Sequence, residues 1–151
     1  MILGSLPGEV SLARAQYYAH PQNQFWGLME TVIDADLVGL TYEARLETLL
    51  EHGVGLWDVV GRARRAGSLD GAIREVTPNA LAEFAATLPA LRAVAFNGLK
   101  ADAIGRGQLP ADFAPAVISL PSSSPAHTLA FARKAEAWAA LRGFSNRAAN
   151  G

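Results

Sequence analysis

The chain has 151 residues, of which 50% are hydrophobic, and its formal net charge is -1. This length fits one domain with a sizeable core, and the charge alone does not mark a nucleic-acid-binding protein. The chain has no cysteine, which excludes disulfides and any iron–sulfur or zinc site with cysteine ligands.

The surroundings of the protein follow from the same inspection. No apolar run approaches the roughly 20 residues of a membrane span, and a start at Met1 leaves no room for a signal peptide. We therefore expect a cytoplasmic protein. The three histidines lack the close spacing of metal ligands, so we predict no metal and no other cofactor.

Strands and helices alternate along the chain, which predicts an α/β protein with a small parallel sheet and helices on both faces. Residues 1–144 should form the single domain, and the small, polar segment 145–151 should fray. In chain order we expect a strand at 1–3, helices at 25–33 and 41–52, a strand or its approach at 55–60, helices at 70–75 and 77–89, a strand at 92–96, a helix at 99–105, a strand at 116–120 and a helix at 128–142.

Periodicity also predicts the buried faces of two helices. Thr41 is a plausible N-cap for the helix that ends before Gly53, and it should bury Leu46, Leu49 and Leu50. The last helix should turn one stripe inward. That stripe comprises Leu129, Ala132, Ala135, Trp138 and Leu141.

Three of the strands run into short polar loops, and ligands of parallel sheets bind beyond the carboxyl ends of the strands. We therefore expect the loops at 4–8, 97–98 and 121–127 to converge on one crevice. The first loop can present backbone N–H groups to a base edge or a phosphate, although it could also be an ordinary tight turn. Asn97 would place an amide in the crevice, or could simply form a turn with Gly98.

The segment 20–26 can reach the same crevice. Asn23 could cap the following helix, or its amide could hold a water or read a base edge. Tyr17 and Tyr18 could stack on a flat ring, whereas Phe25 and Trp26 have the spacing of core residues.

The last loop holds three hydroxyls between two prolines. Ser122, Ser123 and Ser124 with Pro125 could pack against a phosphodiester, or could only cap the next helix. His127 could donate to a phosphate or to a leaving base, or could be a surface residue.

Several common catalytic patterns are absent from the sequence. It has no Walker A loop, no GxGxxG fingerprint and no GxSxG elbow. Asp58 and Asp70 lie 12 residues apart without the spacing of paired carboxylates, so we do not predict a two-carboxylate hydrolase.

Taken together, six segments in order resemble the uracil-DNA glycosylase superfamily, and most closely its hypoxanthine-DNA glycosylase branch, often called family 6. The resemblance runs from Leu3 to about Leu141. The segments are GSLPG at 4–8 with Ser11, QYYAHPQNQFW at 16–26, GLWD at 55–58, GSLD at 67–70, FNG at 96–98 and LPSSSPA at 120–126.

This resemblance implies a three-layer sandwich with a four-stranded parallel sheet, and a damaged base flipped into a pocket at the strand ends. Asn23 is the implied catalytic residue, and Asn97 is implied to recognise or position the base. The implied base-binding set is Gly4, Ser5, Leu6, Pro7, Tyr17, Tyr18 and Phe25 with Asn97. The implied DNA-binding set is Ser122, Ser123, Ser124, Pro125 and His127.

The sequence departs from two other branches. The mismatch-specific uracil branch shares the HPxNxFW segment but places a catalytic Asn in the first loop, where this chain has Leu6. The classical uracil enzymes begin the last loop with His, where this chain has Leu120. The hypoxanthine branch similarly lacks a polar side chain at the first of these positions.

We therefore expect a DNA repair enzyme of base excision repair that removes a deaminated base, hypoxanthine first, from damaged DNA. With that function we expect a monomer, which in a prokaryote would be nucleoid-associated. With Lys100 and Lys134 as the sole lysines, a Schiff-base lyase step is not expected, so the glycosylase should be a monofunctional hydrolase. One alternative is a mismatch-specific uracil or thymine glycosylase. Another is a catalytically silent nucleic-acid or nucleotide-binding module of the same fold.

Overall fold

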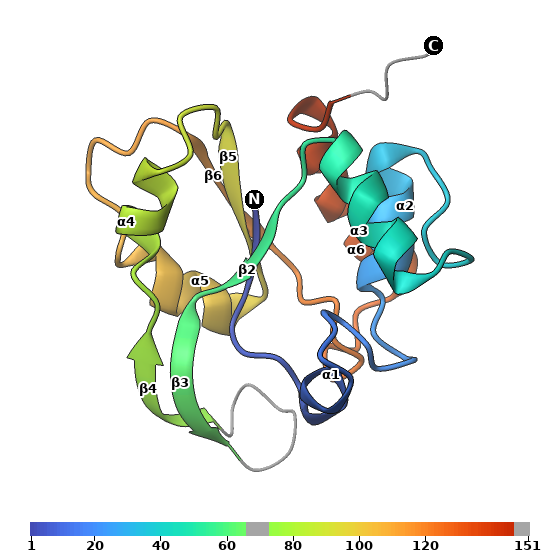
Figure 1. Cartoon of the computed structure of the whole chain (residues 1–151), viewed down its shortest axis with the longest axis horizontal. Helices are drawn as coiled ribbons and strands as arrows, with labels where there is room; N and C mark the ends of the chain where they lie inside the picture. The colour runs from blue at the N-terminus through green and yellow to red at the C-terminus, as the bar shows by residue number, and fades with distance from the viewer. Residues whose placement is uncertain (66–72, 147–151) are drawn as a thin grey trace.

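The computed structural model describes residues 1–65 and 73–146, with the side chains of 61–65 and 73–77 left out. None of the described helices is long and apolar enough to cross a membrane. The elements, drawn in Figure 1, are β1 (Ile2–Gly4), α1 (Glu9–Arg14), α2 (Phe25–Ile33), α3 (Tyr42–Glu51), β2 (Leu56–Asp58), β3 (Val60–Arg65), β4 (Ile73–Pro78), α4 (Leu81–Ala86), β5 (Ala93–Asn97), α5 (Leu99–Arg106), β6 (Ala116–Leu120), α6 (Phe131–Trp138) and the 3-10 helix η2 (Ala139–Gly143).

Four parallel strands form the central sheet in the order β2-β1-β5-β6, which confirms the predicted sheet. The chain adds β2 on one side of β1, and later adds β6 on the opposite side of β5. The direction in which strands are added therefore reverses between β1 and β5. Gly4 pairs with Asp58, and Asn97 pairs with Leu120. The carboxyl ends of all four strands therefore lie along one edge, where ligands of such sheets bind.

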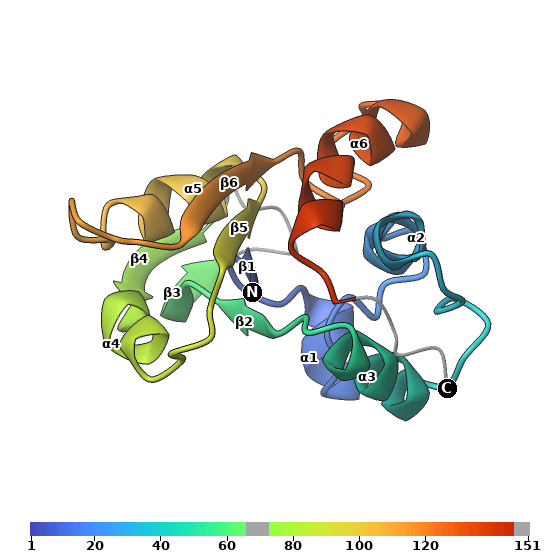
Figure 2. The ribbon, with the colours of Figure 1, turned by 90° about the horizontal axis from the view of Figure 1, so that it is seen from above.

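Helices cover both faces of the sheet, as the sequence predicts. Successive residues of a strand point to opposite faces. Ile2 accordingly belongs to a core cluster with side chains of α2, and Leu3 to a second cluster with side chains of α4 and α5. In Figures 1 and 2, α4 and α5 lie on one side of the strands, and α2, α3 and α6 lie on the other. The fold is a three-layer α/β sandwich.

The helix at 42–51 confirms its predicted cap but not its predicted face. The hydroxyl of Thr41 accepts a hydrogen bond from the N–H of Ala44 at 3.2 Å. Leu49 is buried, but Leu46 and Leu50 are 37% and 76% exposed. The prediction of three buried leucines is therefore wrong, because only one edge of this helix packs against the core.

The segment around residue 75 forms a strand where the sequence predicted helices. Residues Ile73–Pro78 are β4, which pairs with β3 in an antiparallel hairpin. The segment is rich in β-branched residues, which favour strands, and pairing with β3 satisfies its backbone. The helix expected from 77 begins only at Leu81. The cap expected at residues 68–70 lies outside the described residues.

The last helix is shorter than predicted and turns a different stripe inward. It begins at Phe131, and η2 replaces its last turn. Leu129 is 42% exposed and Ala132 is also exposed, whereas Trp138 and Leu141 are buried as predicted. Lys134 takes the remaining inward position, which no periodicity argument assigns to a cation.

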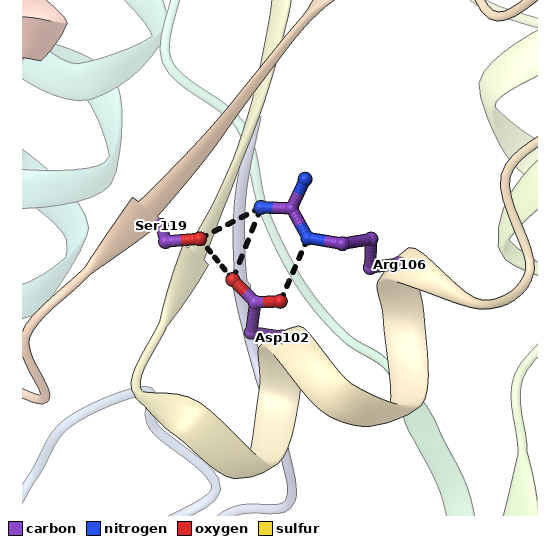
Figure 3. A network of polar contacts seen from close by, with 3 residues as sticks. All are labelled: Asp102, Arg106 and Ser119. Carbon is purple, nitrogen blue, oxygen red and sulfur yellow. Dashed lines mark hydrogen bonds and ion pairs between the residues drawn. The ribbon is translucent and has the colours of Figure 1, made fainter.

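A polar network on the second face fixes α5 to β6 (Figure 3). Arg106 donates from Nε to Asp102 Oδ1 at 2.8 Å and from Nη2 to the Ser119 hydroxyl at 2.7 Å, and that hydroxyl donates to Asp102. The guanidinium also lies 5.9 Å from the centre of the Phe96 ring. The hydrogen bond from Arg106, with a smaller contribution from Ser119, holds the pKa of Asp102 below its usual value.

This network makes the stability depend on pH in a defined direction. Asp102→Asn should lower the free energy of unfolding at pH 7 by about 1 kcal/mol or less, because the pair is partly exposed. The carboxyl pKa is depressed in the folded state, so its contribution is present above the unfolded pKa and is lost as the pH falls through the folded value. Urea unfolding should show the difference closing below about pH 4. An equal difference at pH 7 and pH 3 would contradict an ionic origin.

Candidate active site

A cleft of about 1050 Å³ opens at the carboxyl edge of the sheet, across the point where the strand order reverses. It brings together the three strand-end loops and the segment before α2, as the sequence predicts. Phe25 alone among the predicted site residues does not line it. The predicted residues that do are Gly4, Ser5, Leu6, Pro7, Tyr17, Tyr18, Asn23, Asn97, Ser122, Ser123, Ser124, Pro125 and His127.

The β1 loop forms one wall of the cleft. At Gly4 the sequence needs a residue without a side chain, because an added Cβ would lie 2.8 Å from Oδ1 of Asp58 and 3.2 Å from the hydroxyl of Tyr18. The carbonyls of Gly4 and Ser5 accept hydrogen bonds from Val59 and Val60, which fix the course of the loop. Leu6 packs partly on the second core cluster and makes this wall apolar.

An aromatic platform lies beside this wall. Tyr18 has a φ of 52°, and its ring stacks on Phe25 with the centres 3.9 Å apart and the planes at 18°. Phe25 is fully buried and also meets Trp138 edge-on. Phe25 belongs to the core and supports Tyr18, which lines the cleft. The base contact expected of Phe25 stays a prediction.

Asn23 occupies the entrance to α2. Its side-chain oxygen accepts a hydrogen bond from the N–H of Phe25 at 2.9 Å, and its own N–H donates to the carbonyl of His20 at 2.9 Å. The helix-cap alternative from the sequence is wrong, because Gln24 is the N-cap of α2 and has no side-chain cap; the hydrogen bond from Phe25 to Asn23 instead closes a turn one residue earlier. This hydrogen bond fixes the direction of the amide, whose NH₂ group donates to no described residue, while the residue itself lines the cleft.

Ser123 connects the serine loop to two other parts of the site. Asn97 donates from Nδ2 to the Ser123 hydroxyl at 2.9 Å, and the Ser123 N–H donates back to Oδ1 of Asn97 at 2.9 Å. The carbonyl of Ser123 accepts from the N–H of Gln24 at 2.9 Å. Ser123 is 1% exposed and Asn97 is 6% exposed. The first role of these two buried residues is therefore structural, because they hydrogen-bond to each other.

The other two serines keep their hydroxyl protons available. The Ser122 hydroxyl accepts from the N–H of Ser124, and the Ser124 hydroxyl accepts from the N–H of Ala126. A hydroxyl that accepts in this way can still donate its proton. Ser122 and Ser124 thus retain donors suited to a phosphate, and His127 lies exposed at the end of the same loop.

The serine loop rests on α6. The indole N–H of Trp138 donates to the carbonyl of Pro121 at 2.9 Å, and Nζ of Lys134 donates to the carbonyl of Ser124 at 3.2 Å. The Lys134 side chain is fully buried, and burial lowers its pKa. The buried Nζ of Lys134 therefore holds the serine loop in place through its hydrogen bond to Ser124.

The cleft also contains residues to which the sequence assigned no site role. Asp58 is the last residue of β2, Lys100 lies in the first turn of α5, and Gly98 lies between β5 and α5. Gly98 has a φ of 99° and packs so closely on Ser122 that an added Cβ would lie 3.1 Å from the Ser122 Cβ. Asp58 could have been found from its place at a strand end, because Gly55 to Asp58 was already expected to approach the sheet.

Burial and a neighbouring charge perturb one phenol in the cleft. Burial raises the pKa of Tyr17, and the negative charge of Asp58 and the nearby Tyr42 raise it further. Tyr17 also donates its N–H to the Tyr42 hydroxyl at 3.0 Å. Within the described residues, no three His, Asp or Glu side chains gather in a way that could hold a metal ion.

The fold is an α/β sandwich whose cleft opens at the point where the strand order reverses, which is where proteins of this class bind their ligands. The family model described as the uracil DNA glycosylase superfamily matches residues 1–142. The chain belongs to this superfamily.

Two curated relatives and one solved structure resemble the chain. The relatives are proteins named hypoxanthine DNA glycosylase: one from Methanosarcina barkeri is 43% identical over 66% of this chain, and one from Methanosarcina acetivorans is 41% identical over 67%. The chain spans 63% and 64% of their lengths. A solution NMR structure from M. acetivorans, provisionally named a uracil DNA glycosylase, matches with a TM-score of 0.77 and 37% identity, covering 94% of this chain and 88% of that one.

The Asn97–Ser123 pair gives a stability prediction. Asn97→Ala should lower the free energy of unfolding by about 1–3 kcal/mol, because it leaves the buried N–H of Ser123 without a partner. Ser122→Ala, in the same loop but outside the pair, should cost less. Denaturant unfolding checks both, and adding Ser123→Ala to Asn97→Ala should cost less than the sum of the single changes. Additive costs would show that the two side chains act independently.

Proposed function

We propose that the protein excises a deaminated base, hypoxanthine first, from DNA by hydrolysing its N-glycosidic bond. The observation that carries this proposal is the Tyr18 ring, held on Phe25 at the edge of a cleft with Asn23 and the serine loop. A flipped base can stack on such a ring, and the deoxyribose phosphate would then lie near the polar loops. The family and the names of the two relatives support the same activity.

Asn23 orients the attacking water in this proposal. Cleavage of the glycosidic bond builds positive charge on the sugar and negative charge on the leaving base. An amide cannot remove a proton as a strong base, but it can hold a water against the anomeric carbon, and oriented attack supplies much of a rate enhancement. The hydrogen bond between Asn23 and Phe25 supports this role, because it gives the amide one fixed direction.

The leaving base meets favourable partial charges. The helix α5 begins at Leu99 without a side-chain cap, so its N-terminal N–H groups place a partial positive charge beside Asn97 and the cleft. Such a charge stabilises negative charge that develops on the base. Asn97 retains one donor and one acceptor beyond its bonds to Ser123, which suits a role in positioning the base.

Leu6 favours hypoxanthine over uracil. The wall that it forms offers neither a donor nor an acceptor beside the base, so a water must be held from Asn23 on another segment. In our proposal the larger purine fills the apolar wall better than a pyrimidine does. The enzyme is further proposed to be a monofunctional, metal-independent, cytoplasmic monomer.

The decisive experiment measures excision under single-turnover conditions. Duplexes carrying hypoxanthine, uracil or xanthine are incubated with the protein, and alkali then cleaves the abasic sites. Hypoxanthine should be released faster than uracil. Asn23→Ser should lower the rate by at least about 100-fold while DNA binding stays nearly intact. Serine can still accept the hydrogen bond from the N–H of Phe25, so this variant separates the turn before α2 from catalysis.

Each alternative gives a distinct outcome in that assay. Equal rates on uracil and hypoxanthine would favour a mismatch-specific uracil enzyme. Binding without release of any base would favour a silent binding module. A wild-type rate in Asn23→Ser would limit Asn23 to a structural role in the turn before α2. Undiminished activity in EDTA is expected, and its loss with recovery on adding zinc or magnesium would contradict metal independence.

Lys100 should contact a DNA phosphate from the rim of the cleft. Lys100→Ala should weaken binding and flatten the slope of log affinity against log salt by about 0.9, the effect of one lost phosphate contact. Fluorescence anisotropy over a salt series measures this slope. Arg92→Ala provides a matched control, because Arg92 precedes β5 at the opposite end of the sheet and packs on Phe144. The same slope for wild type and Lys100→Ala would remove Lys100 from the interface.

A further inference from the structure

Positive charge is concentrated in the hairpin that β3 and β4 form. The two strands contain one acid, Glu75, and four arginines, which are Arg62, Arg64, Arg65 and Arg74. Four positive charges and one negative charge give the hairpin strands a formal charge of +3. Because the whole chain has a formal charge of -1, the remaining residues carry -4. A cationic element on an otherwise acidic protein favours the binding of a polyanion at that element.

The hairpin is anchored at the wall of the cleft. The N–H of Val60, its first residue, donates to the carbonyl of Ser5 at 3.0 Å, and the N–H of Asn79, just after its last residue, donates to the carbonyl of Val59 at 2.8 Å. Val59 and Val60 are buried in the second core cluster, onto which Leu6 packs. Both ends of the hairpin are therefore fixed beside the β1 loop, which lines the cleft.

From this anchor the hairpin extends outward at the carboxyl edge of the sheet. Figure 1 shows β3 continuing from β2 to the same end of the molecule as α1, whose residues Val10 and Ser11 line the cleft. Arg65 lies five positions after Val60, so the strand spans up to about 17 Å at the usual rise per residue. That distance corresponds to roughly five nucleotides along one DNA strand. The hairpin can therefore reach phosphates beside a nucleotide that is bound in the cleft.

The register of the two strands places like charges opposite each other. Arg64 pairs with Arg74, and the register is irregular between Arg62 and Arg64. Like charges that are directly opposed destabilise an antiparallel pair, whereas a bound polyanion offsets their repulsion. Positions that break a local rule of stability in this way are expected at functional sites. The pairing therefore favours a role in binding over a role in the stability of the hairpin.

We infer that the β3–β4 hairpin is a second DNA-binding element, which contacts backbone phosphates of the duplex beside the flipped nucleotide. The inference rests on the proposed function, because it takes damaged duplex DNA as the ligand. Arginine suits such contacts, since its guanidinium is always charged and binds a phosphate bidentately. Phosphate contacts position a protein on DNA and carry no direct sequence information. The hairpin therefore adds to the affinity for DNA and not to the choice of base.

The test measures how the affinity for duplex DNA depends on salt. Fluorescence anisotropy gives the Kd of wild type and of the double variant Arg64→Gln/Arg74→Gln over a salt series. Two lost phosphate contacts should flatten the slope of log affinity against log salt by about 1.8, so the loss of affinity should be about 12-fold larger at roughly 50 mM than at roughly 200 mM salt. Arg64→Lys/Arg74→Lys keeps both charges and should retain most of the slope.

A matched control removes two charges at the opposite end of the molecule. Arg92 donates to the carbonyl of Gly143 at 3.0 Å, and Arg142 donates to the carbonyl of Thr31 at 3.2 Å. Arg92→Gln/Arg142→Gln should keep the wild-type slope. An equally flattened slope in this control would overturn the inference, because net charge alone would then explain the effect.

Thermal unfolding separates binding from folding. Arg64→Gln/Arg74→Gln removes opposed like charges, so its unfolding midpoint should equal or exceed that of wild type. A lower midpoint together with weaker binding would overturn the inference, because the arginines would then serve the structure of the hairpin.

Duplexes with one short flank locate the contact. Hypoxanthine is placed near one end or near the other end of a duplex, so that only one flank is long in each. The hairpin leaves the cleft on one side, so Arg64→Gln/Arg74→Gln should lose affinity relative to wild type on one of the two duplexes only. An equal loss on both would contradict a contact with a defined flank.

Single-turnover excision separates this inference from the function beneath it. At saturating protein, Arg64→Gln/Arg74→Gln should release hypoxanthine at the wild-type rate, because the cleft is unchanged. Wild type that binds DNA but releases no base contradicts the proposed function, and the salt slopes still report on the hairpin. Equal slopes for wild type and the hairpin variant overturn the role of the hairpin alone.

Discussion

The reciprocal hydrogen bonds between Asn97 and Ser123 are the constraint on which the rest of the site depends. They join the end of a central strand to the last loop, and the carbonyl of Ser123 extends the connection to Gln24 at the start of α2. Each of the three segments is long-range from the others, so the bonds hold together parts of the chain that have no local reason to meet. Because the pair is buried, water competes poorly for these bonds, and an opening of the loop would leave polar groups unsatisfied.

The core and the site share side chains, which makes the geometry of the cleft a consequence of packing. Phe25 fills the first core cluster and simultaneously supports Tyr18. Trp138 belongs to the same cluster and holds the carbonyl of Pro121. Protein interiors are close-packed and resist deformation. The Tyr18 ring on Phe25 and the serine loop on Trp138 therefore keep their positions. Catalysis by an amide depends on orientation rather than on basicity and therefore needs such rigid support.

Patterns of apolar residues predict the parallel sheet and the convergence of its loops, because both follow from strand order and chain direction. They do not predict which serine faces inward. Ser122, Ser123 and Ser124 are chemically identical, and the choice of Ser123 depends on Asn97, 26 residues away. The strand at 73–78 was missed for a related reason: its pairing with β3 outweighs the helical reading of its local sequence. The burial of Lys134 could not be predicted from the sequence, because its hydrogen-bond partner is a backbone carbonyl and no residue type marks it.

In the proposed mechanism, the rate of bond cleavage and the choice of base depend on the same rigid groups in the cleft. Leu6 leaves the first loop without a carboxylate or an amide beside the base, so the water is oriented from Asn23 alone in the mechanism that we propose. If bond cleavage is slow, the enzyme acts mainly on a base that remains bound in the cleft long enough to react. The time that a base stays bound then depends on how well it stacks and on how well its polar groups are paired. The packing that would fix the amide of Asn23 also fixes the Tyr18 ring on Phe25, so in the proposed mechanism the position of the water and the position of the base depend on the same core.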